Sequence, residues 1–164
     1  MSNQRLNVGD ILAVLFSRGD GETFHWAICI ATTDKIARKY HAKEPIRDHW
    51  FFERPAPSHS ILTSRTVCAA VKIGRVGPET NLNNLEQYLS QIPMEIPAAE
   101  VGFEARFSCR VWFKEAVRRL HQARIINCPD IYNLEAECKA YAQANEASQA
   151  SWSGYLYHVS RCSA

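Results

Sequence analysis

The chain has 164 residues, of which 46% are hydrophobic and 22% charged, and its net charge at neutral pH is +2. These values are typical of one globular domain, over residues 1–164, with a hydrophobic core. The small net charge argues against nucleic acid or an anionic membrane surface as a partner. No run approaches the ~18 consecutive apolar residues of a membrane-spanning helix, and the polar residues 1–7 lack the apolar run of a signal peptide. We therefore expect a cytoplasmic protein without an integral membrane segment.

Six cysteines are scattered along the chain, and no two of them form a CxxC pair. Without a secretion signal, this pattern predicts reduced thiols rather than a disulfide framework. No candidate ligands stand at the spacing of a zinc finger or ribbon. We expect no metal and no organic cofactor. The cysteines are Cys29, Cys68, Cys109, Cys128, Cys138 and Cys162.

Residues 7–76 form the predicted β-rich half of the domain. Short apolar runs separated by polar turns predict strands, and a polar loop with two glycines between the first two runs predicts a hairpin. Prolines and histidines interrupt any period between residues 43 and 60. The expected strands are residues 11–16, 24–30, 36–41 and 66–76.

Residues 81–147 form the mainly helical half. Leucines at helical spacing follow Asn81, a plausible N-cap, and a second amphipathic pattern follows Ser108 as its N-cap. A third helix is expected from about Asp130 to Ala147, and a terminal strand is expected over residues 154–160. The fold class is therefore α+β, with a mainly antiparallel sheet packed against about three helices.

Cys109 is the candidate nucleophile because it stands in the first turn of the second predicted helix. Free backbone N–H groups and the helix dipole favour a thiolate there, and the thiolate is the reactive form of cysteine. Cys109 also shares a helix face with Trp112 and Leu120, which directs it toward the sheet. The alternative is a buried thiol that only fills space in the core.

Two histidines on neighbouring predicted strands are the candidate partners of this thiol. His25 opens one strand and could act as a general base facing the helix start. His41, in the next strand, could orient His25 as the third member of a triad does. The alternative for each is a purely structural strand residue. Cys29, a rival nucleophile on the strand of His25, lies too far along it, at ~13 Å, for His25 to serve it.

Three further residues are candidates for binding the substrate. Trp26 and Trp112 could line an apolar pocket beside Cys109, and their alternative is a place in the core. Arg110, next to Cys109, could bind an acidic group, and its alternative is an exposed helix position.

The run Asn7-Val8-Gly9-Asp10-Ile11-Leu12, followed by His25-Trp26-Ala27-Ile28, resembles the opening of lecithin:retinol acyltransferase-like proteins, a circularly permuted branch of the NlpC-type, papain-like cysteine hydrolases. His25 matches the catalytic histidine of that family, and His41 matches the second histidine that orients it. Cys109, in Phe-Ser-Cys-Arg-Val-Trp, matches the nucleophile. The resemblance implies a permuted papain-like fold and a thiol acyl-enzyme mechanism.

The function expected from the sequence is a cysteine-dependent hydrolase or acyltransferase. Cys109 would attack an ester, thioester or amide of a small-molecule acyl substrate, with His25 as base and His41 as its orienting partner. One alternative is a non-catalytic binding module on the same fold, since Arg110 and Val111 replace the Glu and His of the family motif. Another is a biosynthetic enzyme that uses the pocket without an acyl-enzyme. The oligomeric state stays open.

Overall fold

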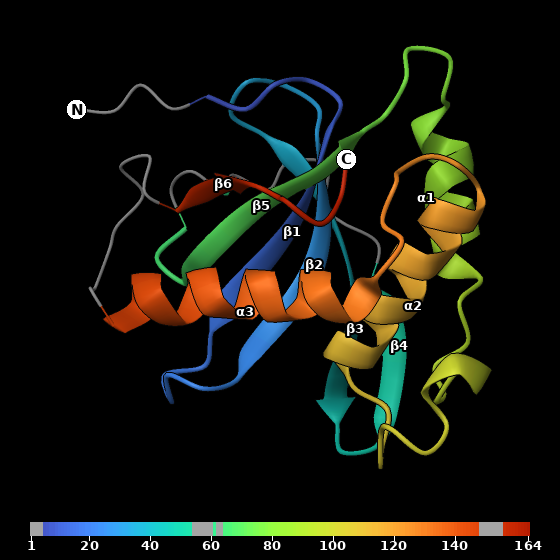
Figure 1. Ribbon diagram of the computed structural model, residues 1–164. Coiled ribbons are helices and arrows are strands. Elements are labelled where there is room, and N and C mark those ends of the chain that lie inside the picture. The colour runs from blue at the N-terminus through green and yellow to red at the C-terminus, as the bar shows by residue number, and fades with distance from the viewer. Residues whose placement is uncertain (1–4, 54–60, 62–63, 148–155) are drawn as a thin grey trace.

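The computed structural model describes residues 5–53, 61, 64–147 and 156–164. Within this part of the chain the fold is α+β, with a six-stranded mixed sheet and three α-helices (Figure 1). The predicted class is thereby confirmed at the level of a mostly antiparallel sheet packed against three helices. None of the helices in the described ranges is long and apolar enough to cross a membrane.

The sheet has the strand order β4-β3-β2-β1-β5-β6. Neighbouring strands are antiparallel except for β5 and β6, which are parallel. The predicted hairpin of β1 and β2 is confirmed, and its loop uses Gly19 and Gly21 at positive φ, 83° and 73°, a conformation that favours glycine. The strands are β1 (Asp10–Ser17), β2 (Phe24–Ala31), β3 (Ala37–Ile46), β4 (His49–Glu53), β5 (Val67–Arg75) and β6 (Tyr157–Val159).

The strand β4 lies in the stretch whose prolines and histidines show no period in the sequence. It pairs with the far end of β3, where His41 stands opposite Glu53. Pro45 falls within the register shift between Lys43 and Ile46, a place where the missing N–H of proline costs no regular ladder bond. The pairing therefore extends β3 beyond the predicted strand and adds an edge strand that the sequence pattern did not indicate.

The helices are α1 (Leu82–Ser90), α2 (Cys109–Gln122) and α3 (Ile131–Ala147), with a short 3-10 helix, η1 (Ala98–Glu100). Both predicted N-caps are confirmed. The Asn81 side chain accepts the N–H of Asn83, and the Ser108 hydroxyl accepts the N–H of Val111 at 3.3 Å. A capped start fixes the first turn of α2, which is the turn that carries Cys109.

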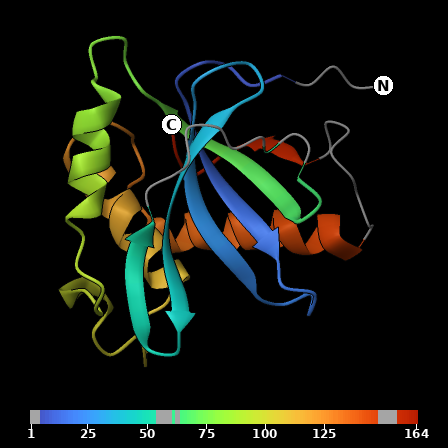
Figure 2. The same cartoon turned by 180° about the vertical axis from the view of Figure 1, so that it is seen from behind.

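The helices α2 and α3 cover one face of the sheet. The first packs on β2 and β3 and the second on β5 and β1 (Figure 1). Trp26, Ile28 and Ile30 of β2 belong to the core cluster beneath these helices. Seen from behind, the sheet lies in front of α3 (Figure 2). On this second face Ala27 and Cys29 pack in a separate cluster with Leu6, Ile61 and Leu156.

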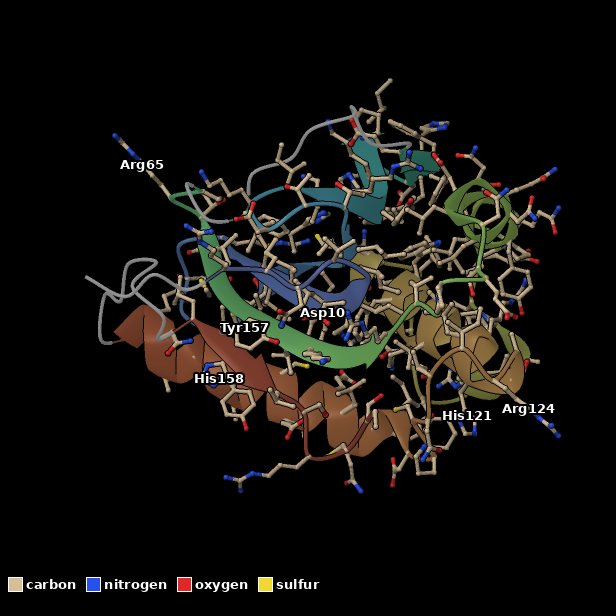
Figure 3. The ribbon with its side chains drawn as sticks, turned by 90° about the horizontal axis from the view of Figure 1, so that it is seen from above. Asp10, Arg65, His121, Arg124, Tyr157 and His158 are labelled. Atoms are coloured by element: carbon tan, nitrogen blue, oxygen red, sulfur yellow. The ribbon has the colours of Figure 1, made fainter. Side chains whose placement is uncertain are left out.

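The terminal strand predicted over residues 154–160 is found as β6 (Tyr157–Val159), and residues 154 and 155 of the prediction lie outside the described residues. The side chains of Tyr157 and His158, neighbours in β6, point to opposite sides of the strand (Figure 3). His158 stacks on Tyr141 of α3 with ring centroids 3.9 Å apart, and the Tyr157 hydroxyl donates to buried Asp10 at 3.5 Å. The strand thereby connects the end of the chain to α3 and to the start of β1.

Candidate functional site

Cys109 occupies the first turn of α2, as predicted. Its side chain belongs to the core cluster between the helices and the sheet and is 1% exposed. The guanidinium of Arg18, in the loop between β1 and β2, donates from Nη2 to Cys109 Sγ at 3.3 Å. The thiol therefore has a cation beside it as well as the N–H groups of a helix start.

A pocket of about 140 Å³ opens at Cys109. Its walls come from the loop between β1 and β2, the start of β2, the start of α2 and one residue of α3. Arg18 and Lys139 give it positive charge, and Glu22 adds one carboxylate. The residues that line it are Arg18, Glu22, Thr23, Phe24, Trp26, Ser108, Cys109, Arg110 and Lys139.

The two predicted histidines are in contact. His25 Nε2 lies 2.6 Å from His41 Nδ1, and His41 Nε2 lies 2.8 Å from Glu53 Oε2. These three residues stand on the neighbouring strands β2, β3 and β4. The structure thus places His41 where it can orient His25, and Glu53 where it can orient His41.

Burial lowers the pKa of both imidazoles. The pKa of His25 falls to about 3 because of burial first and then the charges of His41 and Arg18. The pKa of His41 falls to about 4, again through burial and then through Lys39, against an opposing contribution from Glu53. Both rings are therefore neutral at physiological pH and able to accept a proton, but a lowered pKa also makes each of them a weaker base.

His25 and Cys109 lie on opposite faces of the sheet. Successive strand residues point to opposite faces, and Trp26 faces α2, with its ring 5.0 Å from that of Phe113. His25 faces the other side, where its ring lies 6.0 Å from that of Phe16, a residue of the second cluster. This placement contradicts the expectation that His25 faces the helix start.

The three predicted substrate-binding residues differ in where they lie relative to the pocket. Trp26 is buried but lines the pocket, so its predicted position beside Cys109 is found. Trp112 is fully buried in the core, where its ring lies 5.9 Å from that of Phe52, and it does not line the pocket.

Arg110 also lines the pocket, yet its charge is already paired. Its guanidinium donates to Glu135 at 2.5 Å and to Glu104 at 2.7 Å. Lys139, an exposed residue of α3, also lines the pocket, and it forms no ion pair with the residues that the structure describes.

A buried ion network holds the start of α2. Lys114, 2% exposed, donates from Nζ to Glu100 of η1 at 2.9 Å and to Glu104 at 2.7 Å. Arg118 also donates to Glu100. Burial by itself raises the pKa of Glu100, but the hydrogen bonds from Arg118 and Lys114 outweigh it and leave that pKa lowered. The network ties the turns before α2 to the helix that carries the thiol.

The other thiols lack these features. All six cysteines are free, and Cys109 is the one that lines the pocket described above. Burial raises the pKa of Cys29 to about 12 and that of Cys68 to about 11, which keeps both protonated and unreactive. Among the described residues, no group of three or more His, Cys, Asp or Glu side chains is arranged to hold a metal ion.

The sequence did not indicate several charged residues of these sites, among them Arg18 and Glu53. Arg18 belongs to a glycine-bearing loop, and nothing in its spacing indicates that it reaches Cys109. Glu53 stands opposite His41 only because β3 and β4 pair. Glu53 could have been identified as a partner of His41 only from a prediction that β3 and β4 pair.

A family model matches residues 11–127, which include all of the residues discussed in both sites except Lys139 and Glu135. Because this match covers more than half of the chain, the protein belongs to the family described as DUF6540, a family of unknown function. The helix α3 and the strand β6 follow the matched region. Searches of curated proteins and of solved structures returned no match.

Proposed function

We propose that this protein is a cysteine-dependent hydrolase or acyltransferase in which Cys109 is the nucleophile. The observation that carries the proposal is the contact of the Arg18 guanidinium with the Cys109 sulfur, 3.3 Å away, at a helix start that opens into a pocket. A thiolate with a cation and helix N–H groups beside it is the reactive form of cysteine. The permuted papain-like fold implied by the sequence resemblance is part of this proposal.

The first half of the reaction uses the start of α2. The thiolate of Cys109 forms a bond to the carbonyl carbon of the substrate, and the leaving group departs with the electron pair of the broken bond. The developing oxyanion needs preorganised donors. The backbone N–H groups of Cys109 and Arg110 precede the first intrahelical hydrogen bond, so they supply donors at this position.

The charges of the pocket give one net positive charge while Cys109 is a neutral thiol and balance once it is a thiolate, so they do not select the charge of the acyl donor. Arg18 and Lys139 are cationic, Glu22 is anionic, and Arg110 is neutralised by its carboxylate partners. A thioester or activated ester suits the site best, because its leaving group departs without first taking up a proton. The small volume of about 140 Å³ fits the acyl group and its neighbouring atoms rather than a long chain.

The second half of the reaction needs a base, because the accepting water, amine or hydroxyl must lose a proton. His25 is neutral, and it is flanked in the chain by Phe24 and Trp26, which line the pocket. Since His25 leaves the strand on the face away from Cys109, the proposal assigns thiol ionisation to Arg18. It assigns the proton of the acyl acceptor to His25 through one water molecule, with His41 as the partner of His25, because Arg18 contacts the thiol and also lowers the pKa of His25 and so lies near both.

The experiment is the rate of single iodoacetamide labelling between pH 5 and 9, with the site mapped by mass spectrometry. It compares wild type with Arg18→Gln and His25→Ala, and with Cys109→Ala as the control that removes the site. We expect Cys109 to label far faster than the other thiols near neutral pH, Arg18→Gln to slow it about tenfold or more, and His25→Ala to leave labelling unchanged. Acyl transfer from a p-nitrophenyl ester should then show a burst in His25→Ala followed by slow turnover.

Two outcomes would redirect the proposal. Slow labelling in His25→Ala, with a normal rate in Arg18→Gln, would establish the Cys–His dyad expected from the sequence in place of the Arg18 pair. An inert Cys109 would refute thiol catalysis. The burial of this thiol and its separation from His25 already favour, as the second candidate, a non-catalytic module that binds a small anion.

A further inference from the structure

Three side chains on adjacent strands form one hydrogen-bonded chain that ends at His25. Glu53 of β4 contacts His41 of β3 at 2.8 Å, and His41 contacts His25 of β2 at 2.6 Å. His41 and Glu53 are direct partners in the β3–β4 ladder. Since the strands hold all three backbones, the order of contacts is set by the sheet and not by a flexible loop.

The chemistry of the donors and acceptors fixes the tautomer of each ring. A carboxylate only accepts hydrogen bonds, so the nitrogen of His41 that faces Glu53, Nε2, carries the proton. Neutral His41 then has its lone pair on Nδ1, which must accept from Nε2–H of His25. The remaining nitrogen of His25, Nδ1, is left with the lone pair.

The surroundings keep both rings in this neutral state. His41 is 4% exposed, and burial is the main cause of the lowered pKa of each histidine. The charged groups around them are Arg18 from the loop before β2, Lys39 and Lys43 from β3, and Glu53 from β4. Lys43 Nζ also lies 3.6 Å from the Glu53 oxygen that His41 contacts.

We propose that Glu53 is a positioning residue that acts through His41 to hold His25 as its Nε2–H tautomer, with Nδ1 as the basic nitrogen. Its importance for turnover rests on the function proposed above, in which His25 takes the proton of the acyl acceptor. Its effect on the tautomers does not rest on that function. Without Glu53, His41 loses the acceptor for Nε2–H and is free to place its proton on Nδ1, which would reverse the direction of the bond to His25.

The test is the tautomer of each ring at pH 7, read from ¹⁵N chemical shifts and two-bond ¹H–¹⁵N correlations of the full-length protein. In wild type we expect both histidines as Nε2–H tautomers. Glu53→Ala should shift His41 toward Nδ1–H and His25 with it, whereas Glu53→Gln should restore the wild-type pattern because its amide oxygen still accepts. A merely structural role would change stability and leave the tautomers as they were.

Glu44→Ala is the matched control, because Glu44 lies on the same strand as His41 and accepts the N–H of Asp48 in the β3–β4 turn. It should change neither tautomer. Where turnover is measured, Glu53→Ala should lower the rate of deacylation roughly 10- to 100-fold and leave iodoacetamide labelling of Cys109 unchanged.

Two results would overturn the proposal. One is a wild-type protein with His41 protonated on Nδ1 or doubly protonated at pH 7, a measurement that needs no variant to fold. The other is Glu53→Ala with both tautomers unchanged. An inert Cys109 refutes the proposed function alone, since the tautomers are read without any substrate.

Discussion

Replacing Lys114 by methionine tests the network that holds the start of α2. Methionine keeps most of the buried aliphatic stem, so the change removes mainly a charge. Lys114 Nζ lies 2.9 Å from Glu100 and 2.7 Å from Glu104, and the side chain of Glu100 is fully buried. Removing one partner of a buried ion pair costs ~3–5 kcal/mol, because the other charge stays buried. Since Arg118 still contacts Glu100, we expect the lower end, about 3 kcal/mol.

Urea unfolding followed by circular dichroism measures this loss. With a slope of about 2 kcal/mol per molar urea, the midpoint should fall by about 1.5 M while the slope stays unchanged. Lys139→Met is the matched control, because Lys139 is an exposed cation on a helix. That substitution should change the free energy of unfolding by no more than about 0.5 kcal/mol.

A double variant separates the ionic contribution from a general effect of the substitution. In Lys114→Met the carboxylate of Glu100 has lost its lysine partner. Adding Glu100→Gln removes that carboxylate. The combined loss should be smaller than the sum of the two single losses by about 1 kcal/mol or more. Additive losses, or a loss below about 1 kcal/mol for Lys114→Met alone, would refute the reasoning.

Three further predictions concern other parts of the fold. Ser108→Ala should lower the free energy of unfolding by about 1 kcal/mol, because α2 loses its N-cap hydroxyl, and Ser108→Asp should recover most of it in the same urea assay. Gly74→Ala would place a Cβ 2.5 Å from Cγ2 of Ile126. It should cost ~1–3 kcal/mol, and the absence of any recovery on adding Ile126→Ala would contradict the clash. The folded-state pKa values of His25 and His41, about 3 and about 4, lie below the ordinary 6.5. Below pH 6.5 the unfolded chain therefore binds more protons than the folded one, and the free energy of unfolding should fall as the pH falls from 6.5 to 5. The fall should be at most ~1.4 kcal/mol per pH unit for each ring. Unfolding at several pH values should show a flatter profile when both histidines are replaced by asparagine.

The sequence predicted most of the elements because their signals are local. Apolar runs bounded by polar turns located β1, β2 and β5, and the hydroxyl and amide side chains that cap α1 and α2 marked where those helices begin. The edge strand β4 was missed because its formation depends on a partner. His49–Glu53 is mostly exposed or half-buried, and what makes it a strand is the ladder with β3, to which the composition of the segment gives no guide.

The face toward which His25 points could not be predicted for a different reason. A strand with one buried face alternates between apolar and polar residues, and that alternation identifies the inward side. The strand β2 is buried on both faces, and its sequence, Phe-His-Trp-Ala-Ile-Cys-Ile-Ala, is apolar at every position except His25. Such a run predicts a central strand but does not show which of its residues face the helices. A His25 that faces the helices and one that faces away from them fit the sequence equally well.

The volumes of the side chains in the two layers that β2 separates determine which of its residues face the helices. The large side chains of Trp26, Ile28 and Ile30 belong to the cluster beneath α2 and α3, and the small ones of Ala27 and Cys29 belong to the cluster on the other face. Turning His25 toward Cys109 would exchange these two sets, because a one-residue slip moves every side chain to the opposite face. The packing of Trp26 against Phe113 is therefore part of what keeps His25 away from the thiol, and the side chain that contacts the thiol is that of Arg18.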